Sequence, residues 1–270
     1  MNYMSPDNKW IGKPTIRPDG IEKVTGSAQY AADYTMPGMV WGKVLRSPHA
    51  HALIKKIDTS KAEALQGVLA VMTGADLPTL PLDVPLPTGP NDIRWISRGC
   101  MAQEKILYVG HPIAAVAATS QEIAIAALDL IEVDYEVLPH VIDVDEAVAP
   151  GAPILHDWIK TEGIEGPTNI SNIMTVKTVD VEKGFGEADL VVERDFKSAA
   201  VHQGYLEPQS CVVSYKPDSQ STIWSSSQGQ FMVRGLTATI TGMATGDVKA
   251  IPAEIGGGFG GKTIIYLEPV

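Results

Sequence analysis

The stretch KILYVGHPIAAVAATSQEIAIAALDLIEVDYEVLP, residues 105–139, decides the fold class of this 270-residue chain. Its first part holds two apolar runs separated by a His-Pro pair, and this pattern predicts a β-hairpin. Thr119 and Glu122 stand three residues apart in the pattern of a capping box, which predicts the start of a helix with one apolar face. The closing VDYEVLP alternates apolar and polar residues and predicts a strand. Strands interrupted by a helix favour an α+β fold.

The residues before this stretch continue the alternation of strands and helices. Residues 28–58 fall into three short alternating runs, which predict a strand meander. Thr59 can cap a short helix that Gly67 ends, and VLAVMTG, residues 68–74, predicts a buried strand. Prolines at positions 78, 81, 85, 87 and 90 then predict an extended surface loop over residues 78–98.

A passage rich in proline and glycine, residues 148–168, separates two halves of the chain. Beyond it the period-two pattern resumes in ISNIMTVKTV, ADLVVERDF, SCVVSYK and STIWSSS, each of which predicts a strand. Residues 228–243 carry apolar side chains at helical spacing, and a last strand is expected from Val248. We therefore predict a first domain over residues 1–150, a linker over 151–168 and a second domain over 169–270.

The composition limits the classes of partner. Hydrophobic residues make up 44% of the chain, enough to bury a core, while 25 glycines and 19 prolines indicate many turns. The 32 acidic and 21 basic residues give a net charge of −11, so the surface should repel nucleic acids and anionic membranes. The longest apolar stretch, residues 112–118, is too short to span a bilayer, and the amino terminus has no signal-peptide pattern. We expect a cytoplasmic protein.

The residues that commonly bind metals are scattered. Cys100 and Cys211 lie far apart and in no C-x-x-C arrangement, so neither an iron–sulfur cluster nor a zinc site is predicted. His202 and Glu207, in HQGYLEP, match no standard ligand spacing, and we expect structural roles for them. The sequence thus predicts two reduced thiols and no protein ligand to a metal.

The densest chemical signal is GGGFGGK, residues 256–262. Because glycines have no Cβ atoms to block an approach, the backbone N–H groups of this segment can contact an anion or an oxo group directly. Together with Thr263 the segment also satisfies the P-loop pattern G-x-x-x-x-G-K-T, so a nucleotide-binding loop over Gly256–Thr263 is one alternative and a purely structural turn is another. A P-loop opens a βαβ unit, however, whereas the residues after Thr263 include Pro269 and predict no helix.

Taken in order, these motifs resemble the large molybdenum-binding subunit of the xanthine dehydrogenase, aldehyde oxidase and carbon monoxide dehydrogenase family. The resemblance covers nearly the whole chain and is carried by DGIEKVTGSAQYAADY, RSPHAHALIKKIDTSKAEALQGVLAVMTGADLP, residues 105–143, HQGYLEP and EIGGGFGGK. It implies that the part up to about residue 150 is a hammerhead-like α/β domain. The rest then corresponds to the start of the first molybdopterin-binding domain.

The resemblance also implies roles for single residues. Gln228, in WSSSQGQF, stands where the family has a glutamine whose amide donates to the apical oxygen on molybdenum. The residues that stand where the family's backbone contacts the pterin are Gly257, Gly258, Phe259 and Gly260. Thr263 stands where purine-oxidising members have a glutamate that binds the heterocycle, which implies a substrate other than a purine.

The activity implied is that of a molybdenum hydroxylase, which oxidises an aldehyde or a heteroaromatic C–H with oxygen from water. The molybdenum-molybdopterin cofactor would be shared with a carboxy-terminal half of the subunit that also carries the catalytic base. No catalytic residue is therefore expected in this chain, which should be inactive alone. Electrons would pass to an iron–sulfur subunit and then to an FAD subunit. A non-catalytic assembly fragment remains an alternative beside the nucleotide-binding protein.

The proposed site requires that two residues far apart in the sequence lie close together in the fold. Gln228 and Phe259 are 31 residues apart (259 − 228 = 31), and we expect them to be neighbours in space. A helix starting at Gln228 and a strand returning from Val248 can bring the helix start and the strand end to one edge of a layer, where ligand sites are favoured. A structure that separates Gln228 from the glycine segment would contradict the site.

Overall fold

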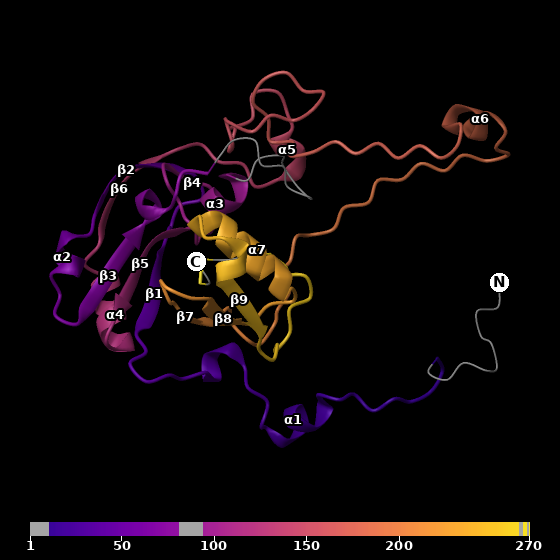
Figure 1. The fold of residues 1–270 in the computed structure, drawn as a ribbon. Coiled ribbons are helices and arrows are strands. Elements are labelled where there is room, and N and C mark those ends of the chain that lie inside the picture. Colours follow the sequence, from indigo (N-terminus) through magenta and orange to yellow (C-terminus); the bar gives the residue numbers. More distant parts are fainter. Residues whose placement is uncertain (1–10, 81–93, 265–266, 269) are drawn as a thin grey trace.

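Helices and strands alternate along the chain in two groups (Figure 1), and the computed structural model describes residues 11–80, 94–264, 267–268 and 270. The helices are α1 (Gly20–Thr25), α2 (Ser60–Glu63), α3 (Arg94–Cys100), α4 (Gln121–Leu128), α5 (Val144–Ala147), α6 (Val181–Gly186) and α7 (Gln230–Thr241). Short 3-10 helices are η1 (Ala31–Asp33), η2 (Gly74–Asp76) and η3 (Thr245–Asp247). The strands are β1 (Trp41–Arg46), β2 (Ala52–Asp58), β3 (Val68–Thr73), β4 (Lys105–Ile106), β5 (Pro112–Ala118), β6 (Glu132–Val137), β7 (Cys211–Ser214), β8 (Ser221–Ser225) and β9 (Val248–Pro252).

Within the described residues these strands form three sheets of three strands each. The first two sheets, in the orders β1-β5-β3 and β4-β2-β6, are antiparallel and lie in the first half of the chain. The third has the order β7-β8-β9, in which β7 and β8 are antiparallel and β8 and β9 are parallel. Two antiparallel sheets and one mixed sheet, with helices packed beside them, confirm the predicted α+β class.

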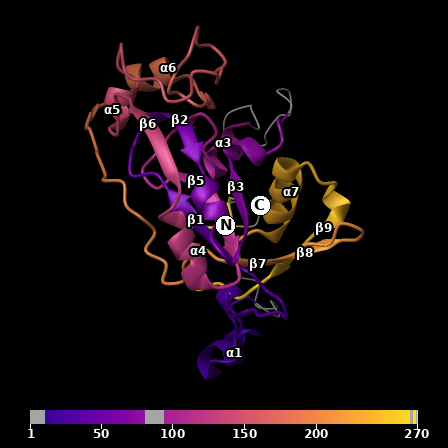
Figure 2. The same ribbon diagram turned by 90° about the vertical axis from the view of Figure 1, so that its left-hand side faces the viewer.

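The core of the first half is built on β5, the central strand of its sheet. Ile113 and Val116 of this strand are buried, and the alanines between them are small enough for α4 to approach closely. Ala127 of α4 and Ala62 of α2 pack into the same apolar cluster as Ala114 and Val116. The helix therefore covers one face of the sheet, as Figure 2 shows for α4 beside β1 and β5.

The predicted hairpin and the predicted meander are both wrong, because strands that follow each other in the sequence lie in different sheets. β4 and β5 belong to different sheets, and β1 and β2 also belong to different sheets. β5 pairs with β1 on one edge and with β3 on the other, so it has no edge left for β4. The two turns that cross between the sheets are bonded to each other: the Ser47 N–H donates to the His111 carbonyl at 2.9 Å, and the Gly110 N–H donates to the Ser47 carbonyl at 2.8 Å.

Several helix boundaries differ from the sequence predictions. α4 has Ser120 as its N-cap, whose Oγ accepts a bond from the Ile123 N–H at 3.3 Å, so the predicted Thr119 capping box is wrong by one residue. Residues 94–98 of the predicted loop belong to α3, and residues 81–93 lie outside the described part of the chain. The short helix after Thr59 is confirmed as α2.

Two of the four strands predicted in the second half are confirmed, as β7 and β8. The other two runs, ISNIMTVKTV and ADLVVERDF, form no strand, and from Ser171 onwards their residues are exposed. Their alternation would suit a half-buried strand, but no neighbouring strand is available to them among the described residues. These two runs flank α6 on a segment that projects away from the rest of the chain (Figure 1).

The two halves of the chain share part of their core. Leu77, Cys100 and Met101 from the first half form one buried cluster with Ile240 of α7 and Leu267. The predicted linker is also folded back, because the Asn169 side chain donates to the Ala147 and Pro153 carbonyls, each at 2.9 Å. These contacts fix the position of the third sheet, which carries the candidate site, against the first half.

A buried histidine provides a test of this core. The His111 side chain is fully buried, its Nδ1 accepts from the Leu107 N–H at 3.2 Å, and its Nε2 donates to the Arg98 carbonyl at 2.7 Å. Burial lowers the pKa of His111 from 6.5 to about 4, so between these pH values the unfolded chain binds a proton that the folded chain excludes.

We expect this group to make the free energy of unfolding fall by about 3 kcal/mol as the pH drops from 6.5 to 4. The substitution His111→Gln can keep one acceptor and one donor without titrating, so its stability should depend less on pH in this window. Urea unfolding at several pH values measures both slopes, with His140→Gln at an exposed position as control. Equal slopes for the wild type and His111→Gln would contradict the assignment.

Candidate functional site

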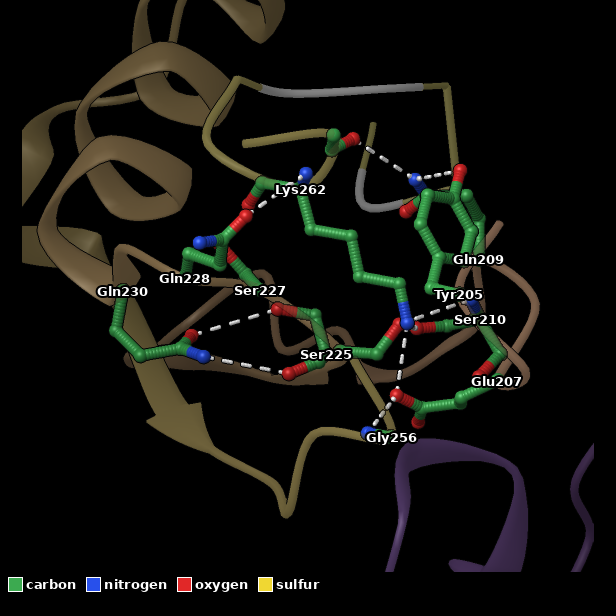
Figure 3. A network of polar contacts seen from close by, with 12 residues as sticks. Tyr205, Glu207, Gln209, Ser210, Ser225, Ser227, Gln228, Gln230, Gly256 and Lys262 are labelled. Carbon is green, nitrogen blue, oxygen red and sulfur yellow. Dashed lines mark hydrogen bonds and ion pairs between the residues drawn. The ribbon is translucent and has the colours of Figure 1, made fainter. Parts of the chain in front are cut away.

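The parallel pairing of β8 and β9 positions the candidate site. Their register runs from Ser221 opposite Val248 to Ser225 opposite Pro252, so both strands end at the same edge of the sheet. The segment leading into α7 leaves the end of β8, and the glycine segment follows the end of β9. Side chains that are far apart in the sequence therefore meet at this edge (Figure 3).

Gln228 is bonded to the glycine segment, as the sequence predicted. Its Oε1 accepts from the Gly260 N–H at 3.0 Å and from the Lys262 N–H at 3.2 Å. The backbone N–H of Gln228 donates to the Lys262 carbonyl at 2.9 Å. α7 begins at Gln230, two residues later than expected, so Gln228 lies in the turn before the helix.

These bonds fix the orientation of the Gln228 amide. Two backbone N–H groups point at one end of the amide, and that end must be the oxygen, because only the oxygen accepts hydrogen bonds. Nε2 therefore faces away from the glycine segment, as Figure 3 shows, and it donates to no described residue. The result is an uncharged donor held in a fixed direction with its hydrogens available.

The glycines of this segment are required by close contacts. A Cβ atom on Gly258 would lie 2.6 Å from Oε1 of Gln228, and one on Gly256 would lie 2.5 Å from Cβ of Glu207. A Cβ atom on Gly261 would lie 2.8 Å from Cε1 of Tyr205. Each of these contacts is shorter than carbon and oxygen atoms tolerate, so the segment packs this tightly only with glycine at all three positions.

The tip of the segment turns outward. Gly257, Phe259 and Gly260 all have positive φ angles, of 94°, 48° and 90°. Such an angle is uncommon for a residue with a side chain, and it leaves the Phe259 ring 73% exposed. The N–H groups of Gly257, Gly258 and Phe259 donate to no acceptor in the described ranges, so they are available to a ligand.

A buried ion pair lies beneath the segment. The Lys262 side chain is fully buried, and its Nζ contacts Oε2 of Glu207 at 2.8 Å and lies 4.8 Å from the centre of the Tyr205 ring. The same carboxylate oxygen accepts from the Gly256 N–H at 2.7 Å (Figure 3). The pair therefore joins both ends of the glycine segment to residues 205–207.

This geometry does not suit a nucleotide. The lysine of a P-loop must reach the phosphates of its ligand, whereas Lys262 is turned inward onto Glu207. No helix starts at the segment in the described residues, and Thr263 donates its hydroxyl to the Gly260 carbonyl at 3.0 Å. The P-loop pattern is thus satisfied in the sequence but not in space.

Sequence reasoning missed the Lys262–Glu207 pair. It assigned Glu207 a structural role, which the buried pair confirms, but it did not identify the partner. The two residues are 55 positions apart, and no periodicity links a loop glutamate to a distant lysine. His202 also has a local role, since its Nδ1 accepts from the Gly204 N–H at 3.0 Å.

The described residues contain no group of three or more His, Cys, Asp and Glu side chains that could hold a metal ion. Cys100 and Cys211 form no disulfide, and burial raises the pKa of each thiol to about 12. No helix in the described part of the chain is long and apolar enough to cross a membrane. What the site offers a ligand is therefore a set of neutral donors: the Gln228 amide and the N–H groups of the glycine segment.

Two family models match the chain. Residues 25–139 match the hammerhead domain of aldehyde oxidase and xanthine dehydrogenase. Residues 164–270 match the molybdopterin cofactor-binding domain. The candidate site lies wholly within the second match.

Curated relatives match over most of the chain. The carbon monoxide dehydrogenase large chain of Afipia carboxidovorans is 37% identical over 95% of this chain and 32% of its own length. A probable xanthine dehydrogenase subunit of Bacillus subtilis is 35% identical over 96% of this chain and 33% of its own length. The nicotinate dehydrogenase large molybdopterin subunit of Eubacterium barkeri is 33% identical over 98% of this chain and 58% of its own length. The chain thus spans about a third of the first two relatives and over half of the third.

Solved structures agree with this result. The Cu,Mo-CO dehydrogenase in its carbon monoxide reduced state matches 95% of this chain and 33% of its own chain, with a TM-score of 0.76 and 33% identity. Quinoline 2-oxidoreductase from Pseudomonas putida 86 matches 94% of this chain and 32% of its own, with a TM-score of 0.74 and 27% identity. The fold of this chain therefore recurs as one part of larger enzymes.

The ion pair beneath the glycine segment can be tested by removing one partner. Lys262→Met leaves the Glu207 carboxylate buried without its cation, which should lower the free energy of unfolding by about 3–5 kcal/mol. Lys249→Met, at an exposed position on β9, should change it by less than about 0.5 kcal/mol. Urea denaturation of the two variants measures the difference, and similar stabilities would argue against a structural role for the pair.

Proposed function

Since the chain belongs to the family of molybdopterin-dependent aldehyde oxidases and xanthine dehydrogenases, we propose that it forms one wall of the molybdenum-cofactor site of a molybdenum hydroxylase. The enzyme would oxidise a C–H of an aldehyde or a heteroaromatic ring with oxygen from water. The observation that carries this proposal is the Gln228 amide, whose oxygen is held by two backbone N–H groups while its donor end faces outward.

The site suits the cofactor by its chemistry. A glutamine amide can donate to an oxygen on a metal without adding a ligand or a titrating proton. The N–H groups of Gly257, Gly258 and Phe259 add neutral donors on the same segment, and the positive φ angles of Gly257 and Gly260 shape its backbone. Bound here, the cofactor would supply the two-electron redox chemistry, while this chain would orient it through Gln228 and the backbone of residues 257–260.

The remaining parts of the reaction would lie outside these 270 residues. We propose that the catalytic base and the second part of the cofactor site lie on the carboxy-terminal half of the molybdenum subunit, so that this chain is inactive alone. The relatives are consistent with this assignment, since the chain spans 32% of the carbon monoxide dehydrogenase large chain. Electrons would leave through an iron–sulfur subunit and an FAD subunit.

The cellular location is also proposed from the chemistry of the chain. Cys100 and Cys211 are thiols that form no disulfide, in keeping with a reducing compartment. We therefore assign the enzyme to the cytoplasm.

The alternative to the proposed function is a non-catalytic assembly fragment. Such a fragment would be isolated without molybdenum.

Gln228→Glu tests the donor in the assembled enzyme. A glutamate carboxylate can still accept from the Gly260 and Lys262 N–H groups, but its second oxygen carries no hydrogen at neutral pH. We expect the loop and the melting temperature to be kept and turnover to fall about 100- to 1,000-fold, the loss typical of removing one donor to developing charge.

The matched control is Gln220→Ala, which removes a glutamine on the surface whose Nε2 donates to the Gly246 carbonyl at 2.8 Å. Molybdenum content by elemental analysis and turnover with an aldehyde are measured for both variants. If the Gln228→Glu enzyme holds molybdenum and turns over like the parent, the cofactor role of Gln228 is wrong.

Thr263 gives a prediction about the substrate. Its hydroxyl is bonded to the Gly260 carbonyl, and it has no carboxylate to make charge-assisted bonds to a purine ring. The assembled enzyme should therefore oxidise xanthine much more slowly than its best aldehyde, which steady-state kinetics on both substrates would measure. Equal rates with xanthine and the aldehyde would contradict the assignment of Thr263 to the substrate site.

A further inference from the structure

One peptide unit at the end of the glycine segment lies between two glutamine side chains (Figure 3). Its carbonyl, from Gly261, accepts from Nε2 of Gln209 at 3.3 Å. Its N–H, from Lys262, donates to Oε1 of Gln228 at 3.2 Å. A hydrogen-bonded relay therefore runs from Gln209 through the peptide between residues 261 and 262 to the Gln228 amide.

The peptide unit transmits orientation because it is planar. It is a trans peptide, so its C=O and N–H groups point in opposite directions within one rigid plane. A side chain that holds the Gly261 carbonyl therefore also sets the direction of the Lys262 N–H. That N–H is one of the two donors on the Gln228 oxygen, so its direction limits the positions that the Gln228 amide can take.

Gln209 is itself held in one orientation. Only its Nε2 can donate to a carbonyl, so this end of the amide must face Gly261, and Nε2 also donates to the Tyr205 hydroxyl at 3.2 Å. Tyr205 packs against the segment at Gly257 and Gly261, where added Cβ atoms would lie 3.1 Å and 2.8 Å from its carbons. The first member of the relay is thus fixed by two contacts.

The two donors on the Gln228 oxygen differ in how firmly they are held. Gly260 is exposed, a Cβ atom there would meet no atom within 4 Å, and its carbonyl accepts from Thr263, which is also exposed. Gly261 and Lys262 are both buried. The buried peptide of the relay is therefore the firmer support for the Gln228 amide.

We propose that Gln209 is a positioning residue, which acts on Gln228 through the peptide between residues 261 and 262 and so sets the direction in which Gln228 presents its donor to the cofactor. This inference rests on the proposed function and adds to it a residue that would act on the cofactor only through Gln228. Without the Gln209 donor the peptide plane can turn, and the Gln228 amide loses its fixed direction.

Amide exchange tests the relay in this chain without a cofactor. Gln209→Met keeps the length of the side chain but removes its donor, so the Lys262 N–H should exchange at least about 10-fold faster than in the wild type. The Gly260 N–H bonds to the same Gln228 oxygen from another peptide, so its exchange should change less than about 2-fold. Equal acceleration at both amides, or none at Lys262, would overturn the proposal.

Two further variants complete this experiment. Gln220→Met is the matched control, because Nε2 of Gln220 also donates to a glycine carbonyl, that of Gly246 on the surface, and it should leave both exchange rates unchanged. Tyr205→Phe keeps the ring but removes the hydroxyl that accepts from Gln209, so it should accelerate exchange at Lys262 by less than Gln209→Met does. A larger acceleration in Tyr205→Phe would contradict the assigned role of Gln209.

A double-mutant cycle tests the effect in the assembled enzyme. Gln209→Met should leave the molybdenum content unchanged, lower turnover about 10- to 100-fold and shift the electron paramagnetic resonance signal of the bound molybdenum. If Gln209 acts only through Gln228, adding Gln209→Met to Gln228→Glu should lower turnover no further. Additive losses of turnover, or an unchanged resonance signal, would overturn the proposal.

The exchange experiment keeps this inference distinct from the proposed function. Faster exchange at Lys262 in Gln209→Met, combined with parental turnover in Gln228→Glu, would support the relay and contradict the cofactor role of Gln228. Unchanged exchange at Lys262, combined with a loss of turnover in Gln228→Glu, would do the reverse.

Discussion

The buried ion pair between Lys262 and Glu207 is the interaction on which the candidate site depends. Removing two charges from water costs several kcal/mol per ion, and only close, well-bonded partners repay that cost. Here the ammonium group is 2.8 Å from the carboxylate, and the carboxylate also accepts from the Gly256 N–H at 2.7 Å. Both ends of the glycine segment are thereby tied to one buried group, although its tip is exposed.

The rigid glycine segment fixes the orientation of the Gln228 side chain. Glycine usually makes a backbone adaptable, but the positions next to Gln228, Glu207 and Tyr205 use the missing Cβ atoms for close packing. The segment can then aim two N–H groups at the Gln228 oxygen, and the donor end of the amide is left facing outward. A neutral donor that needs no reorganisation when a ligand arrives is suited to holding an oxo group on a metal.

Residues 171–201 and the body of the chain differ in how they are stabilised. The body keeps its own core, with α7 packed through Ile240 against Leu77 and Met101 of the first half. Residues 171–201 instead expose apolar side chains such as Phe196, and outside α6 their backbone forms no hydrogen-bonded ladder with the described chain.

The sequence by itself determined many of the elements, and it determined the family. Local periodicity and turn residues predicted β3, β7, β8, α7 and β9 because they depend on neighbours a few residues away. The motif order, with Gln228 and the glycine segment, was sufficient to name the family that the comparisons confirm.

Only the tertiary structure decided which elements are partners. β4 and β5 lie in different sheets because β5 has both edges occupied by distant strands, and ISNIMTVKTV has the pattern of a strand but no strand to pair with among the described residues. The inward turn of Lys262 likewise depends on Glu207, which is 55 positions away, so a sequence that matches the P-loop pattern does not fold as a P-loop. Sequence patterns act over a few residues, whereas sheet edges and buried charges are satisfied by whatever the fold brings near them.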